Sequence, residues 1–99
     1  MAAKVILITG ANHGIGYETA KAFLQSPNPY HILLGTRSLQ KGENALQNLR
    51  AECPSTTNSI EVVQIDVASD ESITRAFDIV KDGHGHLDTL INNAGRHTV

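Results

Sequence analysis

Three glycines stand where a strand-like run gives way to a helix-like one. The segment Thr9–Gly16 has the sequence T-G-A-N-H-G-I-G and follows the apolar run Lys4–Thr9. We expect Gly10 to permit a tight turn, Gly14 to let a ligand approach the backbone, and Gly16 to let the helix pack closely on the strand. Free backbone N–H groups at the positive end of that helix would then be suited to bind a pyrophosphate.

Polar residues follow two further strand-like runs. Asp66 ends the run Ile60–Asp66, and the segment Asn92–Gly95 (N-N-A-G) follows the run Leu87–Ile91. Each segment taken alone is an ordinary turn sequence. Their interpretation therefore depends on the other motifs of the chain.

The run Tyr30–Gly35 is followed by the tripeptide T-R-S at positions 36–38. Sheets that bind NAD usually carry an acidic residue here, which holds the ribose 2′-hydroxyl. Thr36 occupies that position, and the Arg37 guanidinium could instead pair with the 2′-phosphate of NADP. Ser38 could add a hydroxyl, and His13 would add weaker support. We therefore expect NADP in preference to NAD, and expect Thr36→Asp to reduce the preference further than the loss of Arg37 would. A solvated surface charge is the alternative interpretation of Arg37.

Strand-like and helix-like segments alternate along the whole chain. The expected strands are Lys4–Thr9, Tyr30–Gly35, Ile60–Asp66 and Leu87–Ile91. The expected helices are Ile15–Gln25, a segment capped by Ser38 that ends before Pro54, and a segment capped by Ser69 that ends at a turn over Gly83–His86. The apolar spacing of the second helix is set by Leu39, Gly42, Leu46 and Leu49. The order β-α-β-α-β-α-β favours an α/β fold with right-handed crossovers, and we expect a Rossmann-type doubly wound parallel sheet with strand order 3-2-1-4.

Composition excludes several other classes of protein. The 99 residues carry a formal net charge of −2, which favours neither nucleic acid nor a membrane surface as a partner. No apolar run approaches the ~20 residues of a membrane span. A single cysteine, Cys53, excludes an internal disulfide framework, so we expect a cytoplasmic protein. His84 and His86 flank Gly85, but no carboxylate or cysteine stands at ligand spacing, and we expect a solvated turn rather than a metal site.

Together, the glycine turn, the Asp66-Val67 pair and the Asn92–Gly95 segment resemble the short-chain dehydrogenase/reductase family over essentially the whole chain. The run His31–Ser38 is similar to the fungal-type members of that family that prefer NADP. The resemblance implies a Rossmann-type fold and hydride transfer between NADP(H) and a carbonyl or alcohol substrate.

The resemblance also implies which residues contact the cofactor. They are Gly10, Asn12, His13, Gly14, Ile15, Gly16, Arg37, Ser38, Asp66, Val67, Asn93, Ala94 and Gly95. The three glycines would line the pyrophosphate, and Asn12 with Ile15 would touch the ribose and the nicotinamide. The pair Asp66-Val67 would bind the adenine, through the aspartate carboxylate and the valine backbone. Asn93–Gly95 would border the adenosine ribose, and Thr9 would tie the first strand to this loop.

Catalysis in the family depends on a Tyr-x-x-x-Lys pair, an upstream serine and a helix asparagine, all of which follow the N-N-A-G segment. The stretch Tyr17–Lys21 has the Tyr-x-x-x-Lys spacing, but it lies in the first helix, and we interpret it as coincidence. We therefore expect residues 1–99 to form an NAD(P)-binding domain truncated before the catalytic segment. The alternative is a non-catalytic dinucleotide-binding or interaction module, and an in-frame Tyr-x-x-x-Lys encoded beyond Val99 would decide against it.

A polypeptide of these 99 residues should accordingly show no measurable dehydrogenase or reductase activity. Loss of the general acid/base alone typically costs about 10²–10⁴-fold in rate. The assay is NADPH oxidation with common ketones and aldehydes, using polypeptide purified free of host enzymes. Reproducible turnover in that assay would contradict the expectation.

Overall fold

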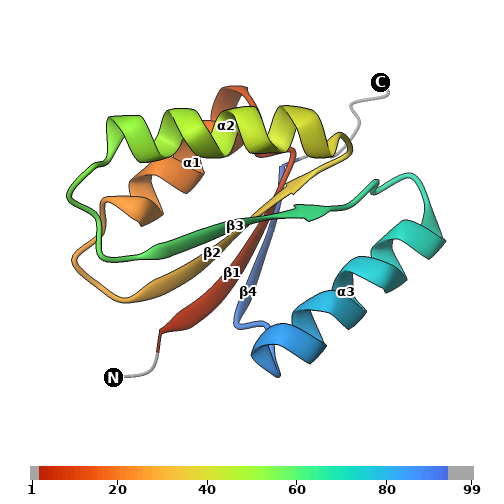
Figure 1. The fold of residues 1–99 in the computed structure, drawn as a ribbon. Helices are drawn as coiled ribbons and strands as arrows, with labels where there is room; N and C mark the ends of the chain where they lie inside the picture. The colour runs from red at the N-terminus through yellow and green to blue at the C-terminus, as the bar shows by residue number, and fades with distance from the viewer. Residues whose placement is uncertain (1–2, 94–99) are drawn as a thin grey trace.

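Four parallel strands form one sheet in the computed structural model, which describes residues 3–93 (Figure 1). The elements follow one another as β1 (Lys4–Thr9), α1 (Gly14–Leu24), β2 (Tyr30–Thr36), α2 (Leu39–Glu52), β3 (Ser59–Gln64), α3 (Asp70–His84) and β4 (Thr89–Asn92). The strand order is β3-β2-β1-β4 and each neighbouring pair is parallel. The predicted topology is therefore confirmed.

Helices cover both faces of the sheet: α1 and α2 lie on one face and α3 lies on the other (Figure 1). Strand β1 is a continuous apolar run because its side chains point alternately into two cores, one on each face of the sheet. Ile6 and Ile8 pack in the core under α1 and α2, whereas Val5 and Leu7 pack in the core under α3. Burial of each such side chain contributes roughly 1.5–3 kcal/mol, so both faces of this central strand hold the sheet in place.

Two serines begin helices as the sequence predicts. The Ser38 hydroxyl oxygen accepts a hydrogen bond from the Lys41 backbone N–H at 3.3 Å, and the Ser69 hydroxyl oxygen accepts one from the Ser72 N–H at 3.2 Å. Each bond satisfies one of the N–H groups that a helix start leaves without a partner. The caps fix where α2 and α3 start relative to the strands before them.

Helix α3 continues further than the sequence predicts. Gly83 belongs to the helix, and the predicted turn over residues 83–86 is wrong at its start. The helix ends at Gly85, which has a φ of +80° and donates its backbone N–H to the Lys81 carbonyl oxygen at 2.8 Å. A left-handed residue is a common helix terminator and glycine adopts it without strain, so the second of the two glycines, not the first, ends the helix.

The fourth strand begins at Thr89 rather than at Leu87, because Asp88 bonds to Val5 with both backbone and side chain. The Val5 N–H donates to Asp88 Oδ2 at 2.7 Å, and the Asp88 N–H donates to the Val5 carbonyl oxygen at 2.9 Å. The carboxylate thus takes the place of a backbone acceptor at the start of the β1–β4 pairing. The regular ladder starts one residue later.

This arrangement predicts a pH-dependent contribution of Asp88 to stability. The Val5 N–H bond, more than the nearby His86, holds the pKa of the Asp88 carboxyl below its ordinary value, which is about 3.9. A carboxyl whose pKa is lower in the folded state stabilises the fold above its unfolded pKa, and this contribution is lost as the pH falls through the folded pKa. Asp88→Ala should lower the melting temperature at pH 7 and should matter less below about pH 3.

The prediction is checked by measuring the melting temperatures of the wild type and Asp88→Ala at pH 7 and below about pH 3. Asp82→Ala is the control, because Asp82 is exposed on α3 and its side chain has no bonding partner among residues 3–93. An equal loss from Asp88→Ala at the two pH values would show that the charge of the carboxylate is not what stabilises the β1–β4 junction.

Candidate functional site

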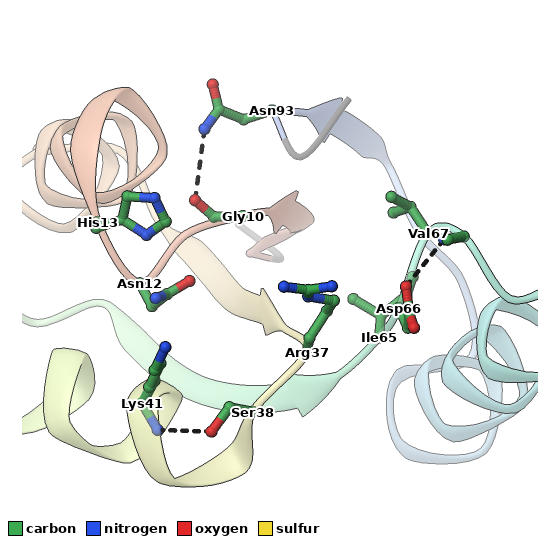
Figure 2. A pocket seen from close by; sticks show the side chains of 11 residues that line it. Gly10, Asn12, His13, Arg37, Ser38, Lys41, Ile65, Asp66, Val67 and Asn93 are labelled. Atoms are coloured by element: carbon green, nitrogen blue, oxygen red, sulfur yellow. Dashed lines mark hydrogen bonds between the residues drawn. The ribbon is translucent and has the colours of Figure 1, made fainter. Parts of the chain in front are cut away.

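A pocket of about 660 Å³ lies at the carboxyl ends of the strands (Figure 2). Its walls come from the turn after β1, the β2–α2 connection, the β3–α3 connection and the end of β4. The lining residues are Gly10, Asn12, His13, Arg37, Ser38, Lys41, Ile65, Asp66, Val67, Ala68 and Asn93. Residues from four separate parts of the sequence thus meet at one edge of the sheet.

The structure places most of the expected site residues around this pocket. Gly10, Asn12, His13, Arg37, Ser38, Asp66, Val67 and Asn93 line it. Gly14 and Ile15 line a shallower groove along α1 instead, where Ile15 is 76% exposed. Gly16 is buried beneath the turn, and Ala94 and Gly95 lie outside the described residues.

The backbone geometry and the packing of the turn explain why glycine occupies positions 10, 14 and 16. Gly10 and Gly14 have φ values of +62° and +61°, which side-chain-bearing residues rarely adopt. A Cβ on Gly14 would meet no atom within 4 Å, so the space in front of it is open. A Cβ on Gly16 would lie 2.7 Å from Asn93 Nδ2 and even closer to the Gly10 carbonyl oxygen. Gly16 therefore lets α1 approach the turn and the end of β4.

Helix α1 begins at the pocket without a side-chain cap. His13 is the N-cap residue and makes no capping hydrogen bond, and the first turn of the helix contains no acidic residue. The first N–H groups of a helix carry the positive end of its dipole. This wall of the pocket is therefore suited to an anionic ligand.

The end of β4 is tied to the glycine turn by hydrogen bonds. Thr9 Oγ1 donates to Asn92 Oδ1 at 2.8 Å and accepts from the Asn93 backbone N–H at 3.0 Å. Asn93 Nδ2 donates to the Gly10 carbonyl oxygen at 3.4 Å, as Figure 2 shows. These bonds confirm the predicted link from Thr9 to Asn92 and Asn93. Asn93 is thereby held as one wall of the pocket.

The β2–α2 connection brings positive charge to the pocket. Arg37 is exposed at the rim, and Lys41 lies in the first turn of α2 on the same side. The sequence did not predict Lys41 at the pocket. Its place three residues after the cap Ser38 puts it in the first turn of α2, but the direction of its side chain depends on how that turn lies over the sheet.

Thr36 does not reach the pocket. Its side chain is only 2% exposed, and its hydroxyl donates to the Ser38 carbonyl oxygen at 2.7 Å. Strand β2 runs one residue further than predicted, so Thr36 keeps the alternation of the strand and faces inward. Thr36 therefore does not line the pocket, and the expected effect of Thr36→Asp stays a prediction.

Asp66 provides the acidic group among the described lining residues. One carboxylate oxygen, Oδ1, accepts from the Ala68 N–H at 3.0 Å, and the Asp66 backbone N–H donates to Ser72 Oγ at 2.7 Å. These bonds fix the turn between β3 and α3. They orient the carboxylate at the pocket and leave Oδ2 for a further donor (Figure 2).

Tyr17 lies outside the pocket and bonds to another helix. Its hydroxyl donates to Glu52 Oε1 at the end of α2, and Lys21 Nζ lies 3.4 Å from Glu52 Oε2. Partial burial, followed by the hydrogen bond to the Glu52 carboxylate and its charge, raises the pKa of Tyr17 to about 12. A tyrosine that acts as a general acid/base needs a lowered pKa. The structure therefore supports a structural role for Tyr17–Lys21 in joining α1 to α2.

The histidines near the end of α3 contact separate carboxylates. His84 Nε2 lies 3.0 Å from Glu61 Oε1, and His86 Nε2 lies 3.0 Å from Asp88 Oδ2. Glu61 is distant from His84 in sequence, which is why the sequence did not predict it as a partner, whereas Asp88 lies only two residues after His86 and was overlooked. Residues 3–93 contain no group of three or more side chains placed to hold a metal ion. In the same part of the chain, no helix is long and apolar enough to cross a membrane.

Comparison with known proteins agrees with this geometry. The family model for short chain dehydrogenase matches residues 4–99. The short-chain dehydrogenase/reductase tropE of Talaromyces stipitatus is 44% identical over 92 residues, which cover 93% of this chain and 35% of that protein. Menthone neomenthol reductase from Mentha piperita superposes with a TM-score of 0.87 at 31% identity, covering 97% of this chain and 33% of that one.

L-sorbose reductase from Gluconobacter frateurii, solved in complex with NADPH and L-sorbose, superposes with a TM-score of 0.82 at 30% identity and covers 98% of this chain and 35% of that one. The chain therefore spans about a third of the length of the relatives that it matches. Because the family model covers nearly every residue and the site lies where the glycine turn meets the strand ends, this chain belongs to the short-chain dehydrogenase/reductase family.

Proposed function

We propose that residues 1–99 form the cofactor-binding part of an NADP-dependent oxidoreductase that transfers hydride between NADP(H) and a carbonyl or alcohol substrate. The family uses NAD or NADP as its cofactor, and one of the similar structures contains NADPH. The observation that carries the proposal is the pocket at the strand ends, where Arg37 rather than an acid reaches the rim after β2. A carboxylate there would repel a 2′-phosphate, whereas a guanidinium pairs with one.

The described residues fit a dinucleotide laid across this edge of the sheet. The uncapped start of α1 and the turn from Gly10 to Gly16 would hold the pyrophosphate. Asp66 Oδ2, which has no bonding partner among residues 3–93, would accept from the adenine amino group, with the Val67 backbone beside the ring. Asn93 would border the adenosine ribose, as would Ala94 and Gly95.

The two ends of the cofactor would meet different surfaces. The exposed side chain of Ile15, beyond the glycine turn, offers an apolar contact for the nicotinamide end, together with the Asn12 amide. At the other end, Arg37 would bind the 2′-phosphate. Ser38 Oγ already accepts from the Lys41 N–H, but its hydroxyl proton remains free to donate to a phosphate oxygen. The bound cofactor would supply or accept the hydride, and this chain's residues would bind and orient it.

Calorimetric titration of the chain with NADPH and with NADH tests the proposal. NADPH should bind more tightly, and the difference should shrink as salt rises, because a 2′-phosphate at an exposed rim is screened. Equal affinities would contradict the NADP preference. Failure of both cofactors to bind a chain that shows native circular dichroism would contradict the cofactor-binding role itself.

A further inference from the structure

We propose that Ser72, in the first turn of α3, is a positioning residue for the adenine end of the cofactor, because its hydroxyl holds the backbone from which the Asp66 carboxylate extends. The inference rests on the proposed function and deepens it. Ser72 does not line the pocket, so it would act through Asp66 without touching the dinucleotide. We expect it to determine how strongly the pocket prefers adenine to a purine that lacks the 6-amino group.

The first argument is that Asp66 lies just beyond the backbone pairing of β2 with β3. Strand β3 ends at Gln64, and the Ile65 N–H still donates to the Thr36 carbonyl oxygen at 2.8 Å. The Asp66 N–H donates instead to Ser72 Oγ at 2.7 Å, a residue six positions further along the chain. A part-buried N–H without a partner costs free energy. The Ser72 hydroxyl therefore satisfies the first backbone donor that the sheet leaves over.

The second argument is that the remaining polar groups of Asp66 are also bonded, with one exception. Its carbonyl oxygen accepts from the Ser69 N–H at 2.9 Å, and Oδ1 of its carboxylate accepts from the Ala68 N–H at 3.0 Å (Figure 2). Oδ2 has no bonding partner among residues 3–93. Together with the bond to Ser72, three hydrogen bonds hold Asp66 and leave one carboxylate oxygen for a ligand.

The third argument is that Ser72 departs from the usual geometry of a helix start. Ser69 is the N-cap of α3, and its hydroxyl oxygen accepts from the Ser72 N–H at 3.2 Å. In a capping box, the side chain three residues after the cap bonds back to the N–H of the cap residue. Here the Asp66 carbonyl oxygen takes that N–H, and the Ser72 side chain reaches the Asp66 N–H instead. The start of α3 is therefore joined to the pocket residue as well as capped.

The fourth argument is that both ends of this bond are anchored in the same core. Ile65, the residue before Asp66, is buried in the core under α3, and Ile73, the residue after Ser72, packs against that core. Close packing of this kind resists small displacements. The hydroxyl of Ser72 thus connects the Asp66 backbone to an element that cannot easily shift relative to the sheet.

Loss of the hydroxyl should loosen the carboxylate without removing its charge. In Ser72→Ala the bonds from Asp66 to Ser69 and Ala68 remain, but the Asp66 N–H has to turn toward water. The carboxylate is then free to sample directions in which Oδ2 does not face the adenine amino group. We expect a loss of about threefold to tenfold in adenine preference, the size of one ordinary hydrogen bond.

The test compares NADPH with its deamino analogue, in which hypoxanthine replaces adenine. The analogue presents a 6-oxo acceptor where NADPH presents an amino donor, so Asp66 Oδ2 would face an acceptor. The wild type should therefore bind NADPH about tenfold to a hundredfold more tightly than the analogue, as expected for a hydrogen bond to a charged group. Calorimetric titration gives both affinities, and circular dichroism checks that each variant is folded.

Ser72→Ala should lower this preference by about threefold to tenfold through weaker binding of NADPH, and should change binding of the analogue by less than about twofold. Ser72→Thr keeps the hydroxyl oxygen and should retain the preference. Ser55→Ala is the matched control, because it removes the same hydroxyl from an exposed residue between α2 and β3 that has no bonding partner among residues 3–93. This control should bind both dinucleotides like the wild type.

The possible failures are distinguishable. If the wild type prefers NADPH to the analogue and Ser72→Ala retains that preference in full, the role of Ser72 is wrong and the proposed function stands. An equal loss for the two dinucleotides would likewise overturn the role, because it would mean that Ser72 supports only the fold. If the wild type binds neither dinucleotide, the proposed function fails and the inference fails with it.

Discussion

Replacing Gly16 with alanine is expected to destabilise the chain by about 1–3 kcal/mol, the usual cost of overpacking, and to weaken NADPH binding strongly. The added Cβ would lie 2.7 Å from Asn93 Nδ2 and closer still to the Gly10 carbonyl oxygen. The second contact is with backbone in a turn that already has a positive φ, so no flexible side chain can move to relieve it. The turn itself must shift, and with it the N–H groups proposed to face the pyrophosphate.

Gly83→Ala is the matched control for the Gly16 variant. Gly83 lies in the last turn of α3, and a Cβ there would meet no atom within 4 Å. Alanine has the higher helix propensity, so this variant should gain up to about 0.5 kcal/mol or stay neutral. Urea denaturation gives the free energy of unfolding of both variants, and titration with NADPH gives their affinities. A Gly16→Ala chain that unfolds and binds like the wild type would mean that α1 does not depend on its close approach to the turn.

Replacing Arg37 with alanine should lower the affinity for NADPH by about tenfold to a hundredfold and leave the affinity for NADH nearly unchanged. A hydrogen bond to a charged group is worth roughly 1.5–3 kcal/mol, which corresponds to about one to two decades in affinity. The change in affinity should not be accompanied by a loss of stability, because the Arg37 side chain has no bonding partner among residues 3–93 and its removal breaks no described hydrogen bond or ion pair.

Arg50→Ala tests whether the effect is local. Arg50 is exposed in the last turn of α2, at the end of the helix distant from the pocket, and its removal changes the net charge equally. This control should bind both cofactors like the wild type. If Arg37→Ala keeps its preference for NADPH, or if Arg50→Ala loses as much, the end of β2 does not select the cofactor.

The strand order and most of the pocket could be predicted from the sequence because the signals are local. Continuous apolar runs identify buried parallel strands, and Ser38 and Ser69 mark where helices begin. Once the alternating order is known, the carboxyl ends of the strands must meet at one edge. The residues just after each strand are therefore predictable neighbours, even across 83 residues as for Thr9 and Asn92.

The features that could not be predicted from the sequence depend on the exact ends of the strands and on which face each helix turns toward the sheet. Strand β2 ends at Thr36 rather than at Gly35, and the alternation of the strand buries the Thr36 side chain away from the pocket. In α2, the predicted apolar face included Leu39, which is 49% exposed, and missed Ala45, which is buried. Lys41 was overlooked for the same reason, since its direction depends on how the first turn of α2 sits over the sheet.

The central claim is that the pocket at the strand ends holds the dinucleotide, and amide chemical-shift mapping with NADPH tests it most directly. We expect the largest shifts in three segments: the glycine turn at residues 10–16, the β2–α2 connection with the first turn of α2 at residues 37–41, and the β3–α3 connection at residues 65–68. Amides near Lys81 on α3 should not move. Saturable shifts centred instead on the α1 groove around Phe23 and Tyr30, or on α3, would contradict the claim.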